Sequence, residues 1–191
     1  MVSAGAWAPG LLGGAYRNIL RPYRQTLVWF EAEEPTAFDP SRSPVFIWMH
    51  GAGEEDWFYG FPRLPGETSV KVAAERFDAP LEHADEVDRE IEPADIDLVW
   101  RHHIAGRVAG LRREGARASS CLYTMAPNSR FLIGRDPGRE HIIVVSACSG
   151  HGFKHSPAIG EAVAMLALES EAPAILAPFD PALALALADG R

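Results

Sequence analysis

The sequence is poor in cysteine and in basic residues, and each shortage excludes a class of protein. Two cysteines, Cys121 and Cys148, are too few for a disulfide framework in 191 residues, which indicates a reducing compartment. Lys and Arg number 18 against 26 Asp and Glu, and the net charge of −8 argues against a nucleic-acid partner, which favours a basic surface. We therefore expect a soluble, cytoplasmic protein that binds no nucleic acid.

The sequence also lacks a long hydrophobic run. No stretch reaches the roughly 20 consecutive apolar residues that a membrane-spanning helix needs, so we expect no membrane partner. The apolar residues 1–16 have no basic region before them, which makes them a poor signal peptide. They are more typical of a strand end and turn at Val2–Gly5 that lead into a helix, and such a start indicates the interior of a larger fold.

Several catalytic and binding motifs are missing as well. The chain has no P-loop, no G-x-G-x-x-G and no G-x-S-x-G, so it supplies neither a dinucleotide fingerprint nor a hydrolase elbow. His151 and His155 have the i, i+4 spacing of half a metal site, but no third ligand suggests itself, and we predict no metal. A lone cysteine such as Cys121 is most often a small buried hydrophobe, so the residues alone leave its reactivity open.

Hydrophobic residues make up 47% of the chain and charged residues 23%, which is typical of a globular protein with a core. In the first half, four short runs rich in β-branched and aromatic residues predict strands, and the polar connections between them indicate a mainly antiparallel sheet. Alternation in the last run places Val70 and Val72 on one face and Lys71 on the other. The four runs are residues 26–31, 44–49, 57–61 and 69–74.

Residues 93–111 carry apolar side chains at helical spacing, which predicts an amphipathic helix. Within it, His102 and His103 point about 100° apart and do not easily share one metal ion, so we interpret both as polar residues of the helix surface. The acidic stretch 82–92 is typical of a solvated loop or helix face, and we assign it no function.

The last third of the chain predicts three strands, at residues 121–125, 131–134 and 141–147. The run IIVV (142–145) is apolar enough to be buried on both faces of a sheet.

The turn GHGFK (150–154) joins the last of these strands to a helix predicted from residue 158 to about residue 169. Ser156 is the expected N-cap, and Pro157 the first helical residue. A strand, a glycine turn and a helix N-terminus together form a geometry that holds anionic groups, and Lys154 adds a positive charge. The residues alone therefore favour an anion or cofactor pocket near Lys154.

Two segments near the C-terminus resemble a known family. Residues 121–137 (CLYTMAPNSRFLIGRDP) and 144–161 (VVSACSGHGFKHSPAIGE) are similar to the C-terminal half of the monomeric sarcosine oxidase and N-methyltryptophan oxidase family of FAD-dependent amine oxidases. Other segments resemble the same family in the same order, so the resemblance runs from about residue 3 to about residue 180. These segments are GAWAPGLL (5–12), PYRQTLVWFE (22–31), FYGFP (58–62) and VKVA (70–73).

The resemblance implies an α+β fold with two parts. A mainly antiparallel or mixed sheet forms the substrate domain, and the C-terminal strand, turn and helix belong to a split FAD-binding domain of the glutathione-reductase-like type. We therefore predict that residues 1–22 end the FAD-binding domain and that residues 23–118 form the substrate (catalytic) domain. Residues 119–191 are predicted to return to the FAD-binding domain with the flavin tether and the GHGFK turn.

The resemblance also implies how FAD is held. Cys121 matches the family cysteine that forms a thioether to the flavin ring, a reaction that requires a thiolate, so we predict covalent FAD. Gly150, Gly152 and Phe153 are predicted to bind the cofactor, because two closely spaced glycines let the backbone pass near a ligand.

Four further residues are predicted to be catalytic by the same resemblance. Lys154 matches the lysine that pairs with the substrate carboxylate, and His151 matches a position near the flavin pyrimidine edge and the substrate. Lys71 matches a lysine held by water near flavin N5 and linked to oxygen reduction, and Tyr59 matches an aromatic residue of the substrate pocket. Glu75 stands where the family often has a histidine, which leaves the identity of the amine open.

The implied reaction is oxidation of the C–N bond of a secondary amino acid, N-methyl or cyclic, such as sarcosine, by O2 to an imine and H2O2. The sequence does not match the N-terminal half of the family, which carries the dinucleotide fingerprint. We therefore expect the chain to be inactive without an N-terminal FAD-binding half, supplied by a separate partner or by a longer product. The alternative is a non-catalytic remnant or interaction module of the same fold that binds no FAD.

Overall fold

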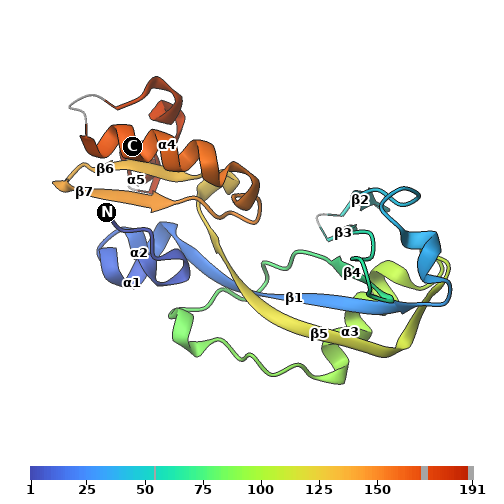
Figure 1. Cartoon of the computed structure of the whole chain (residues 1–191). Coiled ribbons are helices and arrows are strands. Elements are labelled where there is room, and N and C mark those ends of the chain that lie inside the picture. Colours follow the sequence, from blue (N-terminus) through green and yellow to red (C-terminus); the bar gives the residue numbers. More distant parts are fainter. Residues whose placement is uncertain (54, 169–171, 189–191) are drawn as a thin grey trace. The chain divides into compact units, whose positions relative to one another are not determined.

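The computed structural model describes residues 1–53, 55–168 and 172–188 (Figure 1). The chain divides into two compact units, each with hydrophobic clusters of its own. None of the described helices is long and apolar enough to cross a membrane. The first unit comprises residues 1–23, 79–87 and 122–191, and the second comprises residues 24–78 and 88–121. The assignment of FAD-binding and substrate domains along the chain stays a prediction.

A five-stranded sheet dominates the second unit. Its strands follow the order β2–β3–β4–β1–β5, and the three neighbouring pairs from β2 to β1 are antiparallel. All four strands predicted in the first half of the chain are present, and the prediction of a mainly antiparallel sheet is confirmed. The strands are β1 (Arg21–Ala32), β2 (Phe46–Met49), β3 (Trp57–Gly60), β4 (Ser69–Ala73) and β5 (Leu111–Met125).

One face of this sheet is the core of the second unit. Phe58, Val70 and Val72 project to that face and are almost completely buried. They cluster with residues of α3 (Pro93–Val99) and of the π-helical turn Trp100–Ile104. Burying each of these side chains contributes about 1.5–3 kcal/mol. The predicted alternation in β4 is confirmed, because Lys71, between the two valines, lies on the opposite face and is half-buried.

The prediction of a helix over residues 93–111 is wrong beyond Ile104. The α-helix covers Pro93–Val99, and a π-helical turn continues it to Ile104. Gly106 and Gly110 follow with φ angles of 75° and 78°, a left-handed conformation that ends a helix. The apolar residue at position 111 therefore begins a strand and does not close a helical face.

The strand predicted at residues 121–125 is only the end of β5. The strand begins at Leu111, and its first ten residues, LRREGARASS, are mostly polar or small. Gly115 within it has a φ of 77°. A polar run with an internal glycine carries little of the β-branched and aromatic signal on which strand prediction depends.

The first unit is built on the hairpin β6 (Leu132–Asp136) and β7 (Arg139–Ser146), which pair antiparallel. Both predicted strands are confirmed, and Val2 adds a short parallel bridge to Val144. Val144 clusters with residues of α1 (Ala8–Leu12) and α2 (Tyr16–Ile19), whereas Ile143 on the opposite face clusters with residues of α4 (Ser156–Leu168). The prediction that this strand is buried on both faces is therefore confirmed.

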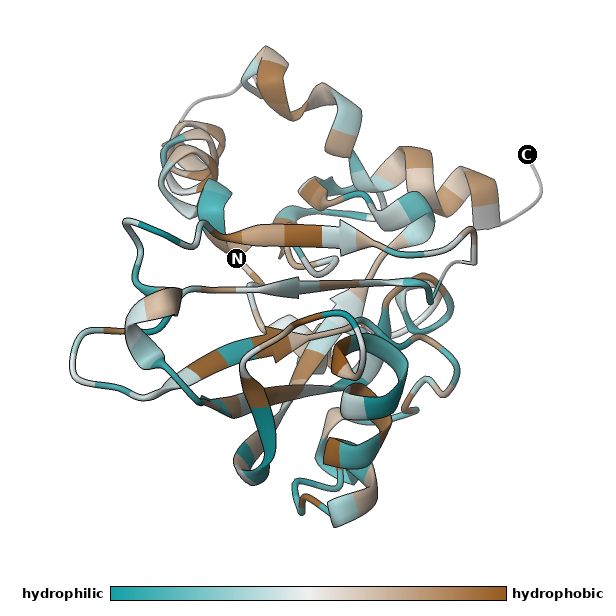
Figure 2. Cartoon of the chain, turned by 90° about the vertical axis from the view of Figure 1, so that its right-hand side faces the viewer, coloured by the Kyte–Doolittle hydropathy of each residue, from teal (hydrophilic) through white to brown (hydrophobic). Residues whose placement is uncertain are grey.

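The described residues form five α-helices, four in the first unit and one in the second, labelled in Figure 1. The helix α5, which precedes the C-terminus in Figure 2, is apolar along most of its length, and the sequence of α4 is also largely apolar. Short 3-10 turns connect the elements, one of them inside the predicted acidic loop. The helices of the first unit are α1 (Ala8–Leu12), α2 (Tyr16–Ile19), α4 (Ser156–Leu168) and α5 (Pro181–Ala188), and that of the second unit is α3. The 3-10 turns are Gly5–Trp7, Pro35–Phe38, Ala84–Glu86, Pro127–Ser129, Phe153–His155 and Ala174–Phe179.

The helix after the glycine turn is confirmed, but its predicted start is wrong. Ser156 has helical angles, φ −55° and ψ −38°, so it lies inside the helix and is not an N-cap. A 3-10 turn, Phe153–His155, leads directly into α4 and takes the place of a side-chain cap. The predicted end of the helix at residue 169 lies outside the described residues.

Candidate functional site

The face of the sheet opposite the core in the second unit carries two of the predicted site residues. In the antiparallel register Trp29 lies opposite Lys71, and Tyr59 lies opposite Ala73, so these side chains share one face. Trp29, Tyr59 and Lys71 are half-buried. One face of the sheet is therefore buried and stabilises the fold, whereas the other face is partly exposed to solvent and carries Lys71 and aromatic side chains.

Aromatic rings surround the ammonium group of Lys71. Its Nζ lies 5.2 Å from the centre of the Phe61 ring and 5.6 Å from that of Trp29, both within the range of cation–π attraction. The Phe61 ring lies 6.0 Å from the Tyr59 ring, so the structure brings Tyr59 and Lys71 together through Phe61. Within the described residues, no carboxylate forms an ion pair with Lys71.

Trp29 contacts a second cation. The guanidinium carbon of Arg117 lies 4.9 Å from the centre of the Trp29 ring, and Arg117 also forms a 3.0 Å ion pair with Glu67. A hollow of about 220 Å³ opens beside these side chains. Sequence reasoning missed Trp29, Phe61 and Arg117, although the two-residue period that assigned Lys71 to this face could have identified Trp29.

The glycine turn of the first unit has a backbone that requires its glycines. Gly150 has a φ of 76°, which side chains rarely tolerate. At Gly152, a Cβ atom would overlap the carbonyl oxygen of Ala147. That close approach is fixed by two hydrogen bonds, in which the amides of His151 and Gly152 donate to the Cys148 carbonyl at 3.0 and 2.9 Å.

Ser149 holds this turn against the end of β5. Its φ of 40° is strained for a residue with a side chain, which costs about 1–3 kcal/mol. Three hydrogen bonds offset the strain: the Ser149 amide donates to the Thr124 carbonyl (3.0 Å), its hydroxyl donates to the Arg130 carbonyl (2.7 Å), and the Ala126 amide donates to the hydroxyl (3.2 Å). The shape of the turn is therefore fixed by hydrogen bonds within the chain.

The side chains of the turn point in different directions. His151 Nδ1 donates to the Ser149 carbonyl at 2.7 Å, so Nε2 is the nitrogen that remains to contact other groups. The Lys154 ammonium donates to the His151 carbonyl at 3.0 Å. Phe153 is 94% exposed, an unusual state for a large aromatic residue. The turn thus presents an aromatic ring and a cation at the start of α4.

The two cysteines fall in different units, Cys121 in the second and Cys148 in the first. Cys121 is half-buried on β5, where strand alternation places it on the same face as Tyr123. The Cys148 sulfur accepts a hydrogen bond from the Thr124 amide at 3.4 Å.

The predicted site residues fall in both units. Tyr59 and Lys71 share one face of the sheet in the second unit, which also contains Cys121 as its last residue. Gly150, His151, Gly152, Phe153 and Lys154 lie together in one turn of the first unit. The roles predicted for these eight residues stay predictions.

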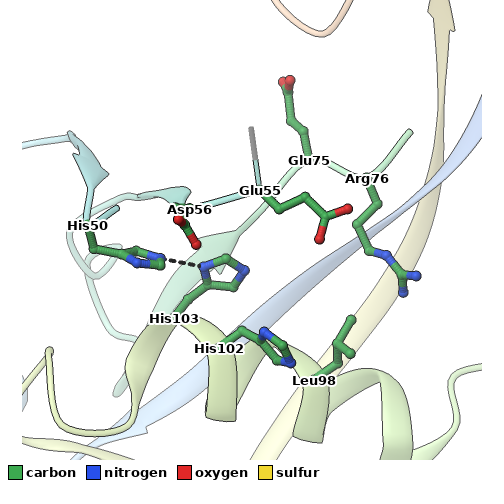
Figure 3. A pocket seen from close by; sticks show the side chains of 8 residues that line it. All are labelled: His50, Glu55, Asp56, Glu75, Arg76, Leu98, His102 and His103. Atoms are coloured by element: carbon green, nitrogen blue, oxygen red, sulfur yellow. Dashed lines mark hydrogen bonds between the residues drawn. The ribbon is translucent and has the colours of Figure 1, made fainter. Parts of the chain in front are cut away.

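A third group of polar residues was interpreted incorrectly from the sequence. His103 is not a residue of the helix surface, because it is only 7% exposed and its Nδ1 lies 3.1 Å from Nε2 of His50 (Figure 3). The wider π-helical turn carries His103 inward, whereas His102 remains exposed as expected. Burial, and then the positive potential of neighbouring basic groups, lower the pKa of His103 to about 4.

The two imidazoles border a small polar pocket of about 120 Å³ (Figure 3). Glu75, the residue in place of the family histidine, also lines it, with its carboxylate directed away from the imidazole pair. Burial raises the pKa of Glu75. Among the described residues, no group of three potential ligands is placed to hold a metal ion.

Replacing Gly152 by alanine should destabilise the protein by more than about 1 kcal/mol, because the new methyl group would displace the Ala147 carbonyl and open the turn. Urea unfolding followed by circular dichroism measures the effect. Gly160→Ala is the matched control, since its Cβ meets nothing within 4 Å on α4, and it should stabilise the helix by about 0.5–1 kcal/mol. Equal stability of Gly152→Ala and the unmodified protein would contradict the rigid turn.

Comparisons with known proteins agree on one relationship. The sequence profile of the family DAO, FAD dependent oxidoreductase, matches residues 1–166. Monomeric sarcosine oxidase of Streptomyces avermitilis is 30% identical over 187 residues, which cover 95% of this chain and 47% of that protein. N-methyl-L-tryptophan oxidase of Salmonella typhi is 29% identical over 181 residues, covering 94% of this chain and 46% of that protein.

Solved structures agree on the fold. NikD, described as an unusual amino acid oxidase essential for nikkomycin biosynthesis, superposes with a TM-score of 0.68 at 19% identity, over 94% of this chain and 47% of that chain. The fructosamine oxidase Amadoriase II of Aspergillus fumigatus superposes with a TM-score of 0.66 at 21% identity, over 98% of this chain and 43% of that chain. The predicted α+β fold is therefore confirmed, and the chain spans about half the length of the curated relatives it matches.

Proposed function

The chain belongs to the family of FAD dependent oxidoreductases, and we propose that it is the substrate-binding and flavin-tethering half of an amine oxidase. The proposed substrate is a secondary amino acid, N-methyl or cyclic, whose C–N bond is oxidised to an imine. FAD, when bound, would accept the hydride and pass the electrons to O2 to give H2O2. An N-terminal FAD-binding half is the proposed partner.

The glycine turn at the start of α4, whose shape is fixed by hydrogen bonds within the chain, is the observation that carries this proposal. Its backbone is fixed by Ser149 and by the close approach at Gly152, and it ends in a helix N-terminus that favours anions. Phe153 stands almost fully exposed there, ready to contact a planar ring system. These residues fit a flavin, whose reduced form is an anion, and would hold its pyrimidine side.

Lys154 would bind the carboxylate of the substrate. Its ammonium now donates to a backbone carbonyl, and a carboxylate is a stronger acceptor for the same group. The side chain is exposed, so the exchange requires only a change of rotamer. His151, whose Nδ1 is engaged with the Ser149 carbonyl, would offer Nε2 to the same region.

Lys71 would stabilise negative charge as oxygen is reduced. The aromatic rings of Trp29 and Phe61 contact its ammonium, and no described carboxylate forms an ion pair with it. A cation held in this way attracts developing anionic charge more strongly than a solvated one. The chain has only two lysines, and both are residues of the proposed site.

The intact mass and the visible spectrum of acid-denatured protein from its own host test the proposal. A mass increment of one FAD, and yellow colour that survives denaturation, would support a flavin-tethering amine oxidase. A bare mass in a colourless protein would favour the alternative, a non-catalytic module of the same fold. Activity with N-methyl and cyclic amino acids, followed as H2O2 release, then identifies the substrate.

Lys154→Met should raise the KM for carboxylate-bearing amines about tenfold to a hundredfold, because a charge-assisted hydrogen bond contributes about 1.5–3 kcal/mol. Flavin content should stay within twofold of the unmodified protein. Lys154→Arg keeps the charge and should recover part of the loss. Parallel losses of flavin and of substrate affinity in Lys154→Met would contradict the assigned role.

A further inference from the structure

A cavity in the first unit lies between the first half of α4, the 3-10 turn Ala174–Phe179 and the residues that precede β6. It has a volume of about 380 Å³, which is within the usual range of small-molecule sites. Lys154, the proposed carboxylate contact of the amine oxidase, does not line it, whereas His151 of the same turn does. Its wall is apolar and formed by Phe131, Ile159, Ala162, Leu176 and Phe179.

The ring of Phe131 is the centre of this wall. It packs against the Phe179 ring, with centres 5.5 Å apart, and stacks on the His151 ring at 4.8 Å and 26°. His155 meets the same ring edge-on at 5.8 Å. Phe131 is only 7% exposed, and three ring contacts fix its orientation. The wall of the cavity beside it is therefore well packed.

The polar groups at this cavity are basic or neutral. Arg130, His151 and His155 line it, and none of the described lining residues is acidic. Within the described part of the chain, Arg130 forms no ion pair, since every ion pair found there involves other basic residues. This concentration of basic groups is notable in a chain whose net charge is −8.

We propose that this cavity binds a small carboxylic acid with an aromatic or branched aliphatic body. The apolar wall would bury the body, and the Arg130 guanidinium would bind the carboxylate at the entrance through paired N–H groups. His155 would supply a further N–H donor. The proposal holds whether or not the chain binds FAD, because none of its contacts requires the cofactor.

Calorimetric titration of the full chain with 3-phenylpropionate and with its neutral amide, 3-phenylpropionamide, tests the proposal. The acid should bind at least about tenfold more tightly than the amide, since only the acid forms the charge-assisted contact. Equal affinity of the two compounds, or no binding of the acid, would overturn the proposal.

Two substitutions locate the binding. Arg130→Gln should lower the affinity for the acid about tenfold and leave the affinity for the amide unchanged. Arg17→Gln removes the same charge from an exposed position of the same unit and should change neither affinity. Equal effects of the two substitutions would indicate general electrostatic attraction and would overturn the proposal.

Ala158→Trp, at an exposed lining position, should block binding of both compounds without lowering the unfolding temperature. Binding of the acid unchanged by Ala158→Trp would place it elsewhere and would also overturn the proposal.

Discussion

Replacing Cys121, the proposed flavin tether, by serine should abolish covalent flavin in any reconstituted holo-protein while leaving its fold intact. A thioether to the flavin ring requires a thiolate, and a serine hydroxyl does not ionise near neutral pH. The change removes no packing, because serine is close to cysteine in size and position 121 is half-buried. Mass spectrometry of the intact chain should show the loss of one FAD mass, and colour should be released on acid precipitation.

Cys148→Ser is the matched control for this experiment. It changes the only other cysteine, whose sulfur accepts a hydrogen bond from Thr124 that a hydroxyl can also accept. Covalent flavin should therefore persist in Cys148→Ser at the level of the unmodified protein. Covalent flavin that persists in Cys121→Ser and is lost in Cys148→Ser would show that Cys148 is the tether.

Acidification should destabilise the second unit through His103. The pKa of this imidazole is about 4 in the folded protein and about 6.5 when unfolded, so the unfolded chain takes up the proton first. Stability is therefore fully present above about pH 6.5 and falls as the pH drops towards 4. Because the side chain is 7% exposed, the loss approaches about 3 kcal/mol, the equivalent of this pKa difference. Urea unfolding at pH 7 and pH 5 measures most of it.

His103→Phe should reduce this pH dependence, since phenylalanine fills the buried site and does not titrate. Its neighbour supplies the control, because His102→Gln changes an exposed residue and should leave the pH dependence as it was. His50→Gln is a second test that keeps a hydrogen-bonding side chain opposite His103. An unfolding free energy with the same slope between pH 7 and pH 5 in His103→Phe would show that another group causes the acid sensitivity.

The strands were predictable where their sequences were both apolar and short. Runs such as FIWM and SVKVA bring β-branched and aromatic residues together between turn residues, and tertiary contacts then agree with the local preference. The first ten residues of β5 carry the opposite signal, because they lie in a sheet through their backbone pairing and not through apolar side chains.

The missed details of the sites have local causes. His103 lies seven residues after Ile96, at the spacing of the apolar helix face, so the pattern held a signal for its burial that its polar character obscured. The aromatic rings around Lys71 come from two other segments of the chain, and only the strand register brings them together. The glycine turn was visible in the sequence, whereas the bonds of Ser149 that fix it depend on contacts with a distant segment.

The interleaving of the two units has a consequence during synthesis. The residues that cover α1 and α2 in the first unit, among them Ala126 and Val144, leave the ribosome about a hundred residues after Leu20. At usual elongation rates the apolar face of α1 and α2 therefore waits about 5–20 seconds for its partners, while every segment of the second unit has already emerged. The second unit can thus fold during translation, and the early helices form an exposed apolar segment that nascent-chain chaperones would recognise.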